Sequence, residues 1–193
     1  TRGEGVMSAV FEDYEPVKGD IPTRNSGALT NITQTIDVYV FKALLEQNNA
    51  TLRFFIHPKL SKQLAQFSAP GGRIELVPQG SRPLNEVMME SNMLVTDYSS
   101  VCWDMLYMDK PVVFYQFDQE RYEKVTGSYL DLSVDLPGDV CLSEQDVLKA
   151  IRECLERGCT IAPKHLPKLA GWFEHKDRDN RKRTYDFIVS EGY

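Results

Sequence analysis

Short apolar runs alternate with longer stretches of helical periodicity along most of this chain. The candidate strands are Val6–Phe11, Leu52–Ile56, Ile74–Val77, Met93–Thr96 and Val112–Gln116, with a weaker one near Val140. Candidate helices lie between them at Thr35–Gln47, Lys59–Phe67, Pro83–Glu90 and Ser100–Met108. Strands that alternate with helices form βαβ units, and the strands of such units are parallel. The sequence therefore predicts an α/β fold: a Rossmann-like, doubly wound parallel sheet of about six strands with helices on both faces.

The size and composition of the chain point to one globular domain. Of its 193 residues, 42% are hydrophobic and 26% are charged, as in an ordinary α/β domain. We expect a single domain over residues 1–193, with helices over 160–193. No apolar run is long enough to span a bilayer. The formal net charge is −6, which disfavours nucleic-acid binding because that function usually requires a basic surface.

The cysteines and histidines offer little for a metal site. Cys102, Cys141, Cys154 and Cys159 include no Cys-x-x-Cys pair, the spacing that zinc sites and redox motifs often use. We therefore expect reduced thiols and no bound metal.

A late helix is predicted to begin after Ser143, because Asp146 lies three residues further on and completes a pattern typical of a capping box. Apolar residues then recur at helical spacing, at Val147, Leu148, Ile151 and Leu155. Gly158 lies where a left-handed residue commonly ends a helix.

A small polar cluster, Thr96-Asp97-Tyr98-Ser99-Ser100, stands where the fourth apolar run ends. In a parallel sheet, ligands bind beyond the carboxyl ends of the strands, and the first turn of the next helix presents free N–H groups. The hydroxyls of Ser99 and Ser100 add donors, so this position suits a phosphate or pyrophosphate, and Asp97 suits a sugar hydroxyl. The alternative is that a serine only caps the helix and Asp97 is a turn residue.

His57-Pro58 follows the apolar run that ends at Ile56. We expect His57 at the same edge of the sheet as Thr96, where a histidine can donate to a phosphate or transfer protons. The alternative is a structural histidine whose ring nitrogens are satisfied by the fold.

The late stretch "FEHKDRDNRKRTYDFI" concentrates positive charge in an acidic chain, with Lys176, Arg178, Arg181, Lys182 and Arg183. Such a run is usually one solvated face of a helix. The functional alternative is an arginine that folds back onto an anionic ligand.

The segment "LVTDYSSVCWDMLYMDKPVVFYQFDQERY" resembles the signature of the CDP-glycerol glycerophosphotransferases, which include the teichoic-acid polymerases and primases of bacterial cell walls. The matching positions are Thr96 to Ser100, Trp103-Asp104, Lys110-Pro111, Asp118 and Tyr122. Three further elements are similar to those of the family: "FIHPKL" with His57-Pro58, "LPGDV" at Leu136–Val140, and "DRDNRKR" with Asp177, Asn180 and Arg183.

The resemblance implies a fold like the C-terminal half of a GT-B glycosyltransferase, the half that holds the nucleotide donor. The N-terminal acceptor domain would then be missing, as the start at Thr1 also suggests. The implied donor is CDP-glycerol or a similar CDP-alditol, with no cofactor and no metal.

The resemblance also implies roles for particular residues. His57 is the expected catalytic residue. The expected donor- and phosphate-binding residues are Thr96, Asp97, Ser99, Ser100, Asp104, Asp118 and Arg183. Charge develops on the departing CMP, where a helix N-terminus with His57 or Arg183 would stabilise it.

The implied reaction transfers glycerol phosphate to a lipid-linked teichoic-acid polymer, at the cytoplasmic face of the bacterial membrane, by a peripheral enzyme. Two alternatives remain open from the sequence. One is a GT-B glycosyltransferase that uses a nucleotide-sugar for a cell-surface polysaccharide. The other is a non-catalytic module that binds a nucleotide or a polymer.

Overall fold

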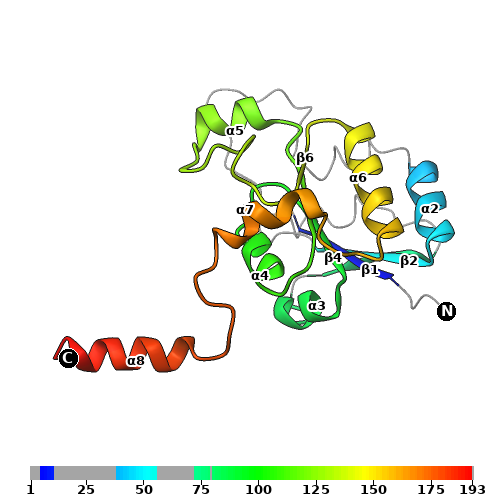
Figure 1. Cartoon of the computed structure of the whole chain (residues 1–193). Coiled ribbons are helices and arrows are strands. Elements are labelled where there is room, and N and C mark those ends of the chain that lie inside the picture. The colour runs from blue at the N-terminus through cyan, green and yellow to red at the C-terminus, as the bar shows by residue number, and fades with distance from the viewer. Residues whose placement is uncertain (1–4, 11–37, 56–71, 79, 193) are drawn as a thin grey trace.

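The computed structural model describes residues 5–10, 38–55, 72–78 and 80–192, and contains one six-stranded parallel sheet (Figure 1). The spatial order is β3-β2-β1-β4-β5-β6. Its strands are β1 (Gly5–Val10), β2 (Ala50–Phe55), β3 (Ile74–Val77), β4 (Met93–Thr96), β5 (Val112–Tyr115) and β6 (Asp139–Cys141). This is the strand order of a doubly wound nucleotide-binding fold, so the predicted fold class and all six predicted strands are confirmed.

The helices also follow the predicted pattern where the structure describes the chain. They are α2 (Val38–Gln47), α3 (Leu84–Glu90), α4 (Val101–Tyr107), α5 (Gln119–Val125), α6 (Glu144–Glu156), the 3₁₀ helix η2 (Pro163–His165), α7 (Leu166–Ala170) and α8 (Asn180–Ser190). The predicted helix at Lys59–Phe67 lies outside the described residues. Helix α5 was not predicted, because its sequence carries few apolar residues and buries none.

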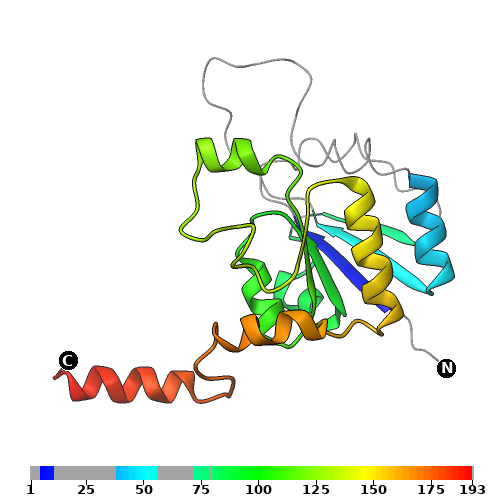
Figure 2. The ribbon, with the colours of Figure 1, turned by 45° about the horizontal axis from the view of Figure 1, so that its top comes forward.

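Two apolar cores cover the two faces of the sheet. Helices α2 and α6 pack on one face (Figures 1 and 2), and helices α3, α4 and α7 pack on the other. Alternation along β5 shows the division: Val113 and Tyr115 enter the first core, whereas Val112 and Phe114 enter the second. Because both faces are covered, β4 and β5 at the centre of the sheet are buried at every position and are apolar except at Thr96, as in parallel sheets generally.

Helix α6 begins and ends as predicted. The Ser143 hydroxyl accepts a hydrogen bond from the Asp146 N–H at 3.2 Å, a side-chain N-cap. At the other end, Gly158 adopts a φ of 69°, and the Cys159 N–H donates to the Cys154 carbonyl at 2.9 Å. This is the hydrogen-bond pattern of a Schellman motif.

The turn before β6 is tightly packed. A Cβ added to Gly138 would lie 2.3 Å from the Val112 carbonyl oxygen, so only glycine fits there without a shift. The next residue, Asp139, lies with one carboxylate oxygen 3.2 Å from His165 Nε2 and 2.5 Å from Lys164 Nζ. The hydrogen bond with His165, aided by Lys164, holds the pKa of Asp139 well below its usual value despite partial burial.

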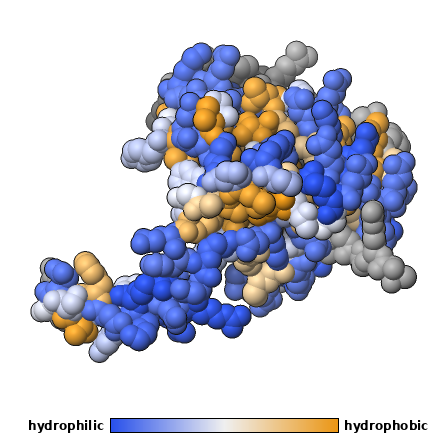
Figure 3. Space-filling model, in the orientation of Figure 1, coloured by the Kyte–Doolittle hydropathy of each residue, from blue (hydrophilic) through white to orange (hydrophobic). Residues whose placement is uncertain are grey.

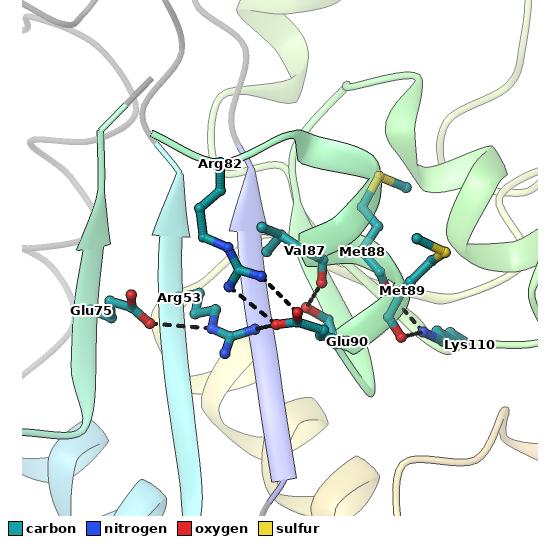
Figure 4. A network of polar contacts seen from close by, with 9 residues as sticks. Arg53, Glu75, Arg82, Val87, Met88, Met89, Glu90 and Lys110 are labelled. Carbon is teal, nitrogen blue, oxygen red and sulfur yellow. Dashed lines mark hydrogen bonds and ion pairs between the residues drawn. The ribbon is translucent and has the colours of Figure 1, made fainter. Parts of the chain in front are cut away.

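A polar network joins the edge of the sheet to α3 (Figure 4). Arg53 on β2 donates to Glu75 at 3.2 Å and to Glu90 at 2.6 Å, and Arg82 also binds Glu90 at 2.6 Å. Nearby, Lys110 Nζ donates to the carbonyls of Met88 and Met89 at 2.8 and 2.7 Å. Both carbonyls lie in the last turn of α3, where carbonyls generally lack a full set of helical partners. The Met88 carbonyl also accepts a hydrogen bond from the Ser91 N–H at 3.3 Å, and Lys110 completes the C-terminal cap.

The C-terminal segment is attached to the second core and then leaves it. Leu169 of α7 is buried in that core, and Trp172 packs on Trp103 of α4 with ring centroids 4.5 Å apart. Helix α8 projects away from the sheet and buries none of its residues (Figures 1 and 2). Figure 3 shows hydrophobic side chains near its free end, where Phe187, Ile188 and Val189 are exposed.

Candidate functional site

The strand order places a switch point between β1 and β4. Chain connections leave these neighbouring strands in opposite directions across the sheet, which opens a crevice at their carboxyl ends. Thr96 ends β4 and is paired with Val10, which ends β1. The predicted cluster Thr96–Ser100 therefore begins at the switch point, on the edge toward which the strands run in Figure 2.

Thr96 and Asp97 form the buried base of this cluster. They are 0% and 2% exposed. The Tyr98 N–H donates to Asp97 Oδ1 at 2.6 Å, and Gln116 Nε2 donates to the Asp97 carbonyl at 3.3 Å. Asp97 thus fixes the path of the chain between β4 and α4, which is the turn role considered above. Its predicted hydrogen bond to a sugar hydroxyl of a ligand stays a prediction.

Ser99 and Ser100 stand directly before α4. Ser100 occupies the N-cap position, but its side chain makes no capping hydrogen bond. Among the described residues, neither serine hydroxyl has a hydrogen-bond partner. Ser143 at the start of α6 shows the contrast, because its hydroxyl does cap its helix. The simple capping alternative therefore does not account for the two serine hydroxyls before α4.

Asp118 is held beside the cluster by two tyrosines. The Tyr98 hydroxyl donates to Asp118 Oδ1 at 2.9 Å. The Tyr98 ring stacks on Tyr122, with centroids 3.6 Å apart and planes 5° from parallel. The structure thus brings together two motif segments that are 20 residues apart. Sequence reasoning assigned no role to either tyrosine, although both lie inside the motif.

Asp104 lies in the first turn of α4, on the exposed side of the helix. It is one helical turn beyond Ser100, so it borders the cluster without contributing to its buried base.

Arg183 lies elsewhere. It is on α8, where it makes hydrogen bonds of 3.0 and 2.8 Å to the two carboxylate oxygens of Asp177. The segment before α8 is tied to the C-terminal end of α4, where the Tyr107 hydroxyl donates to the Asp177 carbonyl at 2.7 Å. The serines lie at the opposite end of α4. The structure therefore does not bring Arg183 to the Thr96–Ser100 cluster.

The ion pair between Arg183 and Asp177 also stabilises the charged forms of both side chains. The Arg183 guanidinium lowers the pKa of Asp177 to about 2, and the carboxylate raises the pKa of Arg183. In this structure, the Arg183 side chain therefore binds Asp177 within the C-terminal segment.

His57 and Pro58 lie outside the described residues. Strand β2 ends at Phe55 and runs parallel to β1, which is parallel to β4. The carboxyl end of β2 is therefore at the same edge of the sheet as Thr96.

The described part of this edge offers neutral hydrogen-bond donors from the serine hydroxyls, together with Asp97, Asp104 and Asp118. No group of three or more metal-binding side chains occurs in the described part of the chain. Neutral hydrogen-bond donors at the start of a helix can bind a phosphate group. Carboxylates can accept hydrogen bonds from the hydroxyls of a ligand. This combination fits a ligand that carries both phosphates and sugar or polyol hydroxyls.

A model of one protein family matches residues 21–190, which is most of the chain, and its description is CDP-Glycerol:Poly(glycerophosphate) glycerophosphotransferase. The chain belongs to this family. The resemblance noted in the sequence is thereby confirmed.

Two curated relatives indicate how far the similarity extends. The minor teichoic acid biosynthesis protein GgaB of Bacillus subtilis (strain 168) is 26% identical over 144 residues, which are 75% of this chain and 16% of GgaB. The teichoic acid ribitol-phosphate polymerase TarK of Staphylococcus aureus (strain NCTC 8325 / PS 47) is 25% identical over 138 residues, 72% of this chain and 26% of TarK. The matched part of the chain thus spans only 16% and 26% of the length of these two relatives.

Solved structures share the fold at low identity. The wall teichoic acid polymerase TagF superposes with a TM-score of 0.67 and 17% identity, covering 97% of this chain and 43% of that one. The UDP-GlcNAc 2-epimerase from Neisseria meningitidis bound to UDP-GlcNAc gives a TM-score of 0.55 and 14% identity, covering 97% of this chain and 45% of that one. These likenesses support the Rossmann-like fold.

Proposed function

We propose that this chain is the donor-binding domain of an enzyme that transfers glycerol phosphate from CDP-glycerol to a teichoic-acid-type polymer. The observation that carries the proposal is a pair of serine hydroxyls at the switch point of a doubly wound sheet, which have no hydrogen-bond partner among the described residues. A pyrophosphate accepts hydrogen bonds and carries negative charge, so it matches these donors and the start of α4. Family membership supports CDP-glycerol as the nucleotide.

In the proposed reaction, a hydroxyl of the polymer attacks the phosphorus that bears the glycerol. The phosphoanhydride bond breaks, CMP leaves, and a new phosphodiester forms, while the hydroxyl proton passes to a base. Such a transfer depends on positioning and on stabilising charge at the departing phosphate. Ser99 and Ser100 would hold the pyrophosphate, and Asp97, Asp104 and Asp118 would border it. His57 is the proposed proton-transferring residue.

We propose that the polymer acceptor is bound by another part of a longer protein. The wall teichoic acid polymerase TagF is more than twice as long as the segment matched here. We infer that an N-terminal acceptor domain faces the carboxyl edge of this sheet in a GT-B arrangement, with this chain as the C-terminal half. Arg183 would serve the donor only if the tail rearranged when the two domains closed.

The proposed place of action is the cytoplasmic face of the membrane. Nucleotide donors are made in the cytosol, and the proposed acceptor is a lipid-linked polymer. Within the described residues, no helix has the length and apolar character needed to cross a bilayer. Peripheral attachment through a partner or through another part of the protein is consistent with that finding.

The test is a donor screen by isothermal calorimetry on this chain, with CDP-glycerol, CDP-ribitol, UDP-glucose and CMP. We expect a CDP-alditol to bind more tightly than CMP, and UDP-glucose not to bind. Tighter binding of UDP-glucose would favour the nucleotide-sugar transferase instead. Equal affinity for CMP and CDP-glycerol, with no turnover in a protein that includes the acceptor domain, would favour the non-catalytic module.

A further inference from the structure

The side chain of Gln116 holds a buried acceptor that lacks a donor. Gln116 follows β5, and its N–H still donates to the Cys141 carbonyl on β6 at 2.8 Å. The residue is only 1% exposed. Its Oε1 atom has no hydrogen-bond partner within the described part of the chain. A buried amide oxygen without a donor destabilises a fold, so Oε1 is available to accept a hydrogen bond from a donor outside these residues.

The orientation of the Gln116 amide is set by its neighbour. Nε2 donates to the Asp97 carbonyl at 3.3 Å. Exchanging the amide oxygen and nitrogen would bring two oxygens together and lose this hydrogen bond. The group that Gln116 presents on its other side is therefore an acceptor.

Gln116 borders the proposed pyrophosphate site. In the sheet, Thr96 is paired with Phe114, and Phe114 enters the core under α4. Side chains alternate along a strand, so Gln116 points to the same face as Phe114, one position beyond the strand end. There it contacts Asp97, two residues before Ser99.

We propose that Gln116 Oε1 accepts a hydrogen bond from a hydroxyl of the nucleotide donor next to its pyrophosphate. This inference rests on the proposed function. A phosphodiester or pyrophosphate group is ionised at neutral pH and has no proton to donate, so the acceptor does not serve the phosphates. A CDP-alditol carries hydroxyls on either side of its pyrophosphate, on the ribose and on the alditol. Gln116 would thus distinguish a donor that carries the correct hydroxyl from one that lacks it.

The experiment combines a substitution with changes to the ligand. Gln116→Met keeps an unbranched side chain of similar length but removes the amide. The three ligands are CDP-glycerol, its 2′,3′-dideoxyribose analogue, and CDP-propanol, which lacks both free glycerol hydroxyls. Affinities come from calorimetry on this chain. Exposed Gln145 on α6 provides the matched control, Gln145→Met, for which we expect unchanged affinity.

We expect Gln116→Met to weaken CDP-glycerol binding roughly tenfold, the effect of one buried hydrogen bond. For the analogue that lacks the hydroxyl bound by Gln116, Gln116→Met should not weaken binding further. If that analogue is the dideoxyribose one, the hydroxyl belongs to the ribose; if it is CDP-propanol, the hydroxyl belongs to the glycerol. Equal weakening of all three ligands, or unchanged affinity with a lower melting temperature, would overturn the inference. Water or the chain itself would then satisfy Oε1. If the unsubstituted chain does not bind CDP-glycerol at all, the proposed function itself fails.

Discussion

Asp139 at the start of β6 offers a quantitative test of how the C-terminal segment is held. Its side chain is 17% exposed and that of His165 is 13% exposed, so their 3.2 Å contact is largely shielded from water. Lys164 contacts the same oxygen but is 63% exposed, and an exposed lysine adds little. Asp139→Asn keeps the shape and removes the charge. A hydrogen bond to a charged group contributes about 1.5–3 kcal/mol, so we expect a loss of about 2 kcal/mol of unfolding free energy at pH 7.

The pH dependence follows from the lowered pKa of Asp139. A carboxyl group whose pKa is lower in the folded state stabilises the fold above its unfolded pKa of about 3.9, and this stabilisation is lost as the pH falls toward the folded value. The difference in unfolding free energy between the unsubstituted chain and Asp139→Asn should therefore be largest at pH 7. At pH 3, where the carboxyl group of the unfolded chain is mostly protonated, this difference should be smaller by about 1 kcal/mol.

The assay is urea-induced unfolding at pH 7 and pH 3. At pH 7 the melting temperature should also fall by about 4–8 °C for a chain of this size. The control is Asp186→Asn on α8, which removes an exposed ion pair with Lys182 and should cost less than about 0.5 kcal/mol. Equal effects of the two substitutions at pH 7, or a difference that does not change at pH 3, would refute the reasoning.

Three other substitutions test features of the fold that support the site. Gly138→Ala should destabilise the chain by about 1–3 kcal/mol in urea unfolding, because its Cβ would meet the Val112 carbonyl at 2.3 Å; a stability unchanged from the original would contradict that packing. Lys110→Met should cost about 1 kcal/mol by loss of the cap on α3, with hydrogen exchange faster in α3 than in α6. Ser143→Ala should cost about 1 kcal/mol through the lost cap and leave CDP-glycerol affinity unchanged, as measured by calorimetry.

The fold was predictable because hydrophobic patterning is a local signal. Central parallel strands are covered on both faces and are therefore apolar on both, so runs such as Val112–Gln116 stood out as strands. Helix α5 was missed because none of its residues is fully buried and only Tyr122 packs partly against the second core, which leaves no periodic apolar pattern in the sequence. The cluster Thr96–Ser100 was also predictable, since it directly follows a strand and the carboxyl end of that strand is the ligand edge of such a sheet.

Features that depend on tertiary contacts were not predictable from the sequence. The separation of Arg183 from the serines follows from the tail docking on Tyr107, a contact across 70 residues. The stack of Tyr98 on Tyr122 depends on how the chain after β5 returns toward α4. Likewise, the finding that the Gln116 side-chain oxygen has no donor among the described residues requires knowledge of its burial and of its neighbours in the fold.

The most direct test of the account is CDP-glycerol affinity in the double variant Ser99→Ala/Ser100→Ala, measured by calorimetry together with the melting temperature. Each hydroxyl lost from a charged phosphate should cost about 1.5–3 kcal/mol of binding free energy, roughly ten- to a hundredfold in affinity. Since neither hydroxyl caps α4 in the described structure, stability should be nearly unchanged. Unchanged affinity with a lowered melting temperature would instead make these serines structural and contradict the proposed donor site.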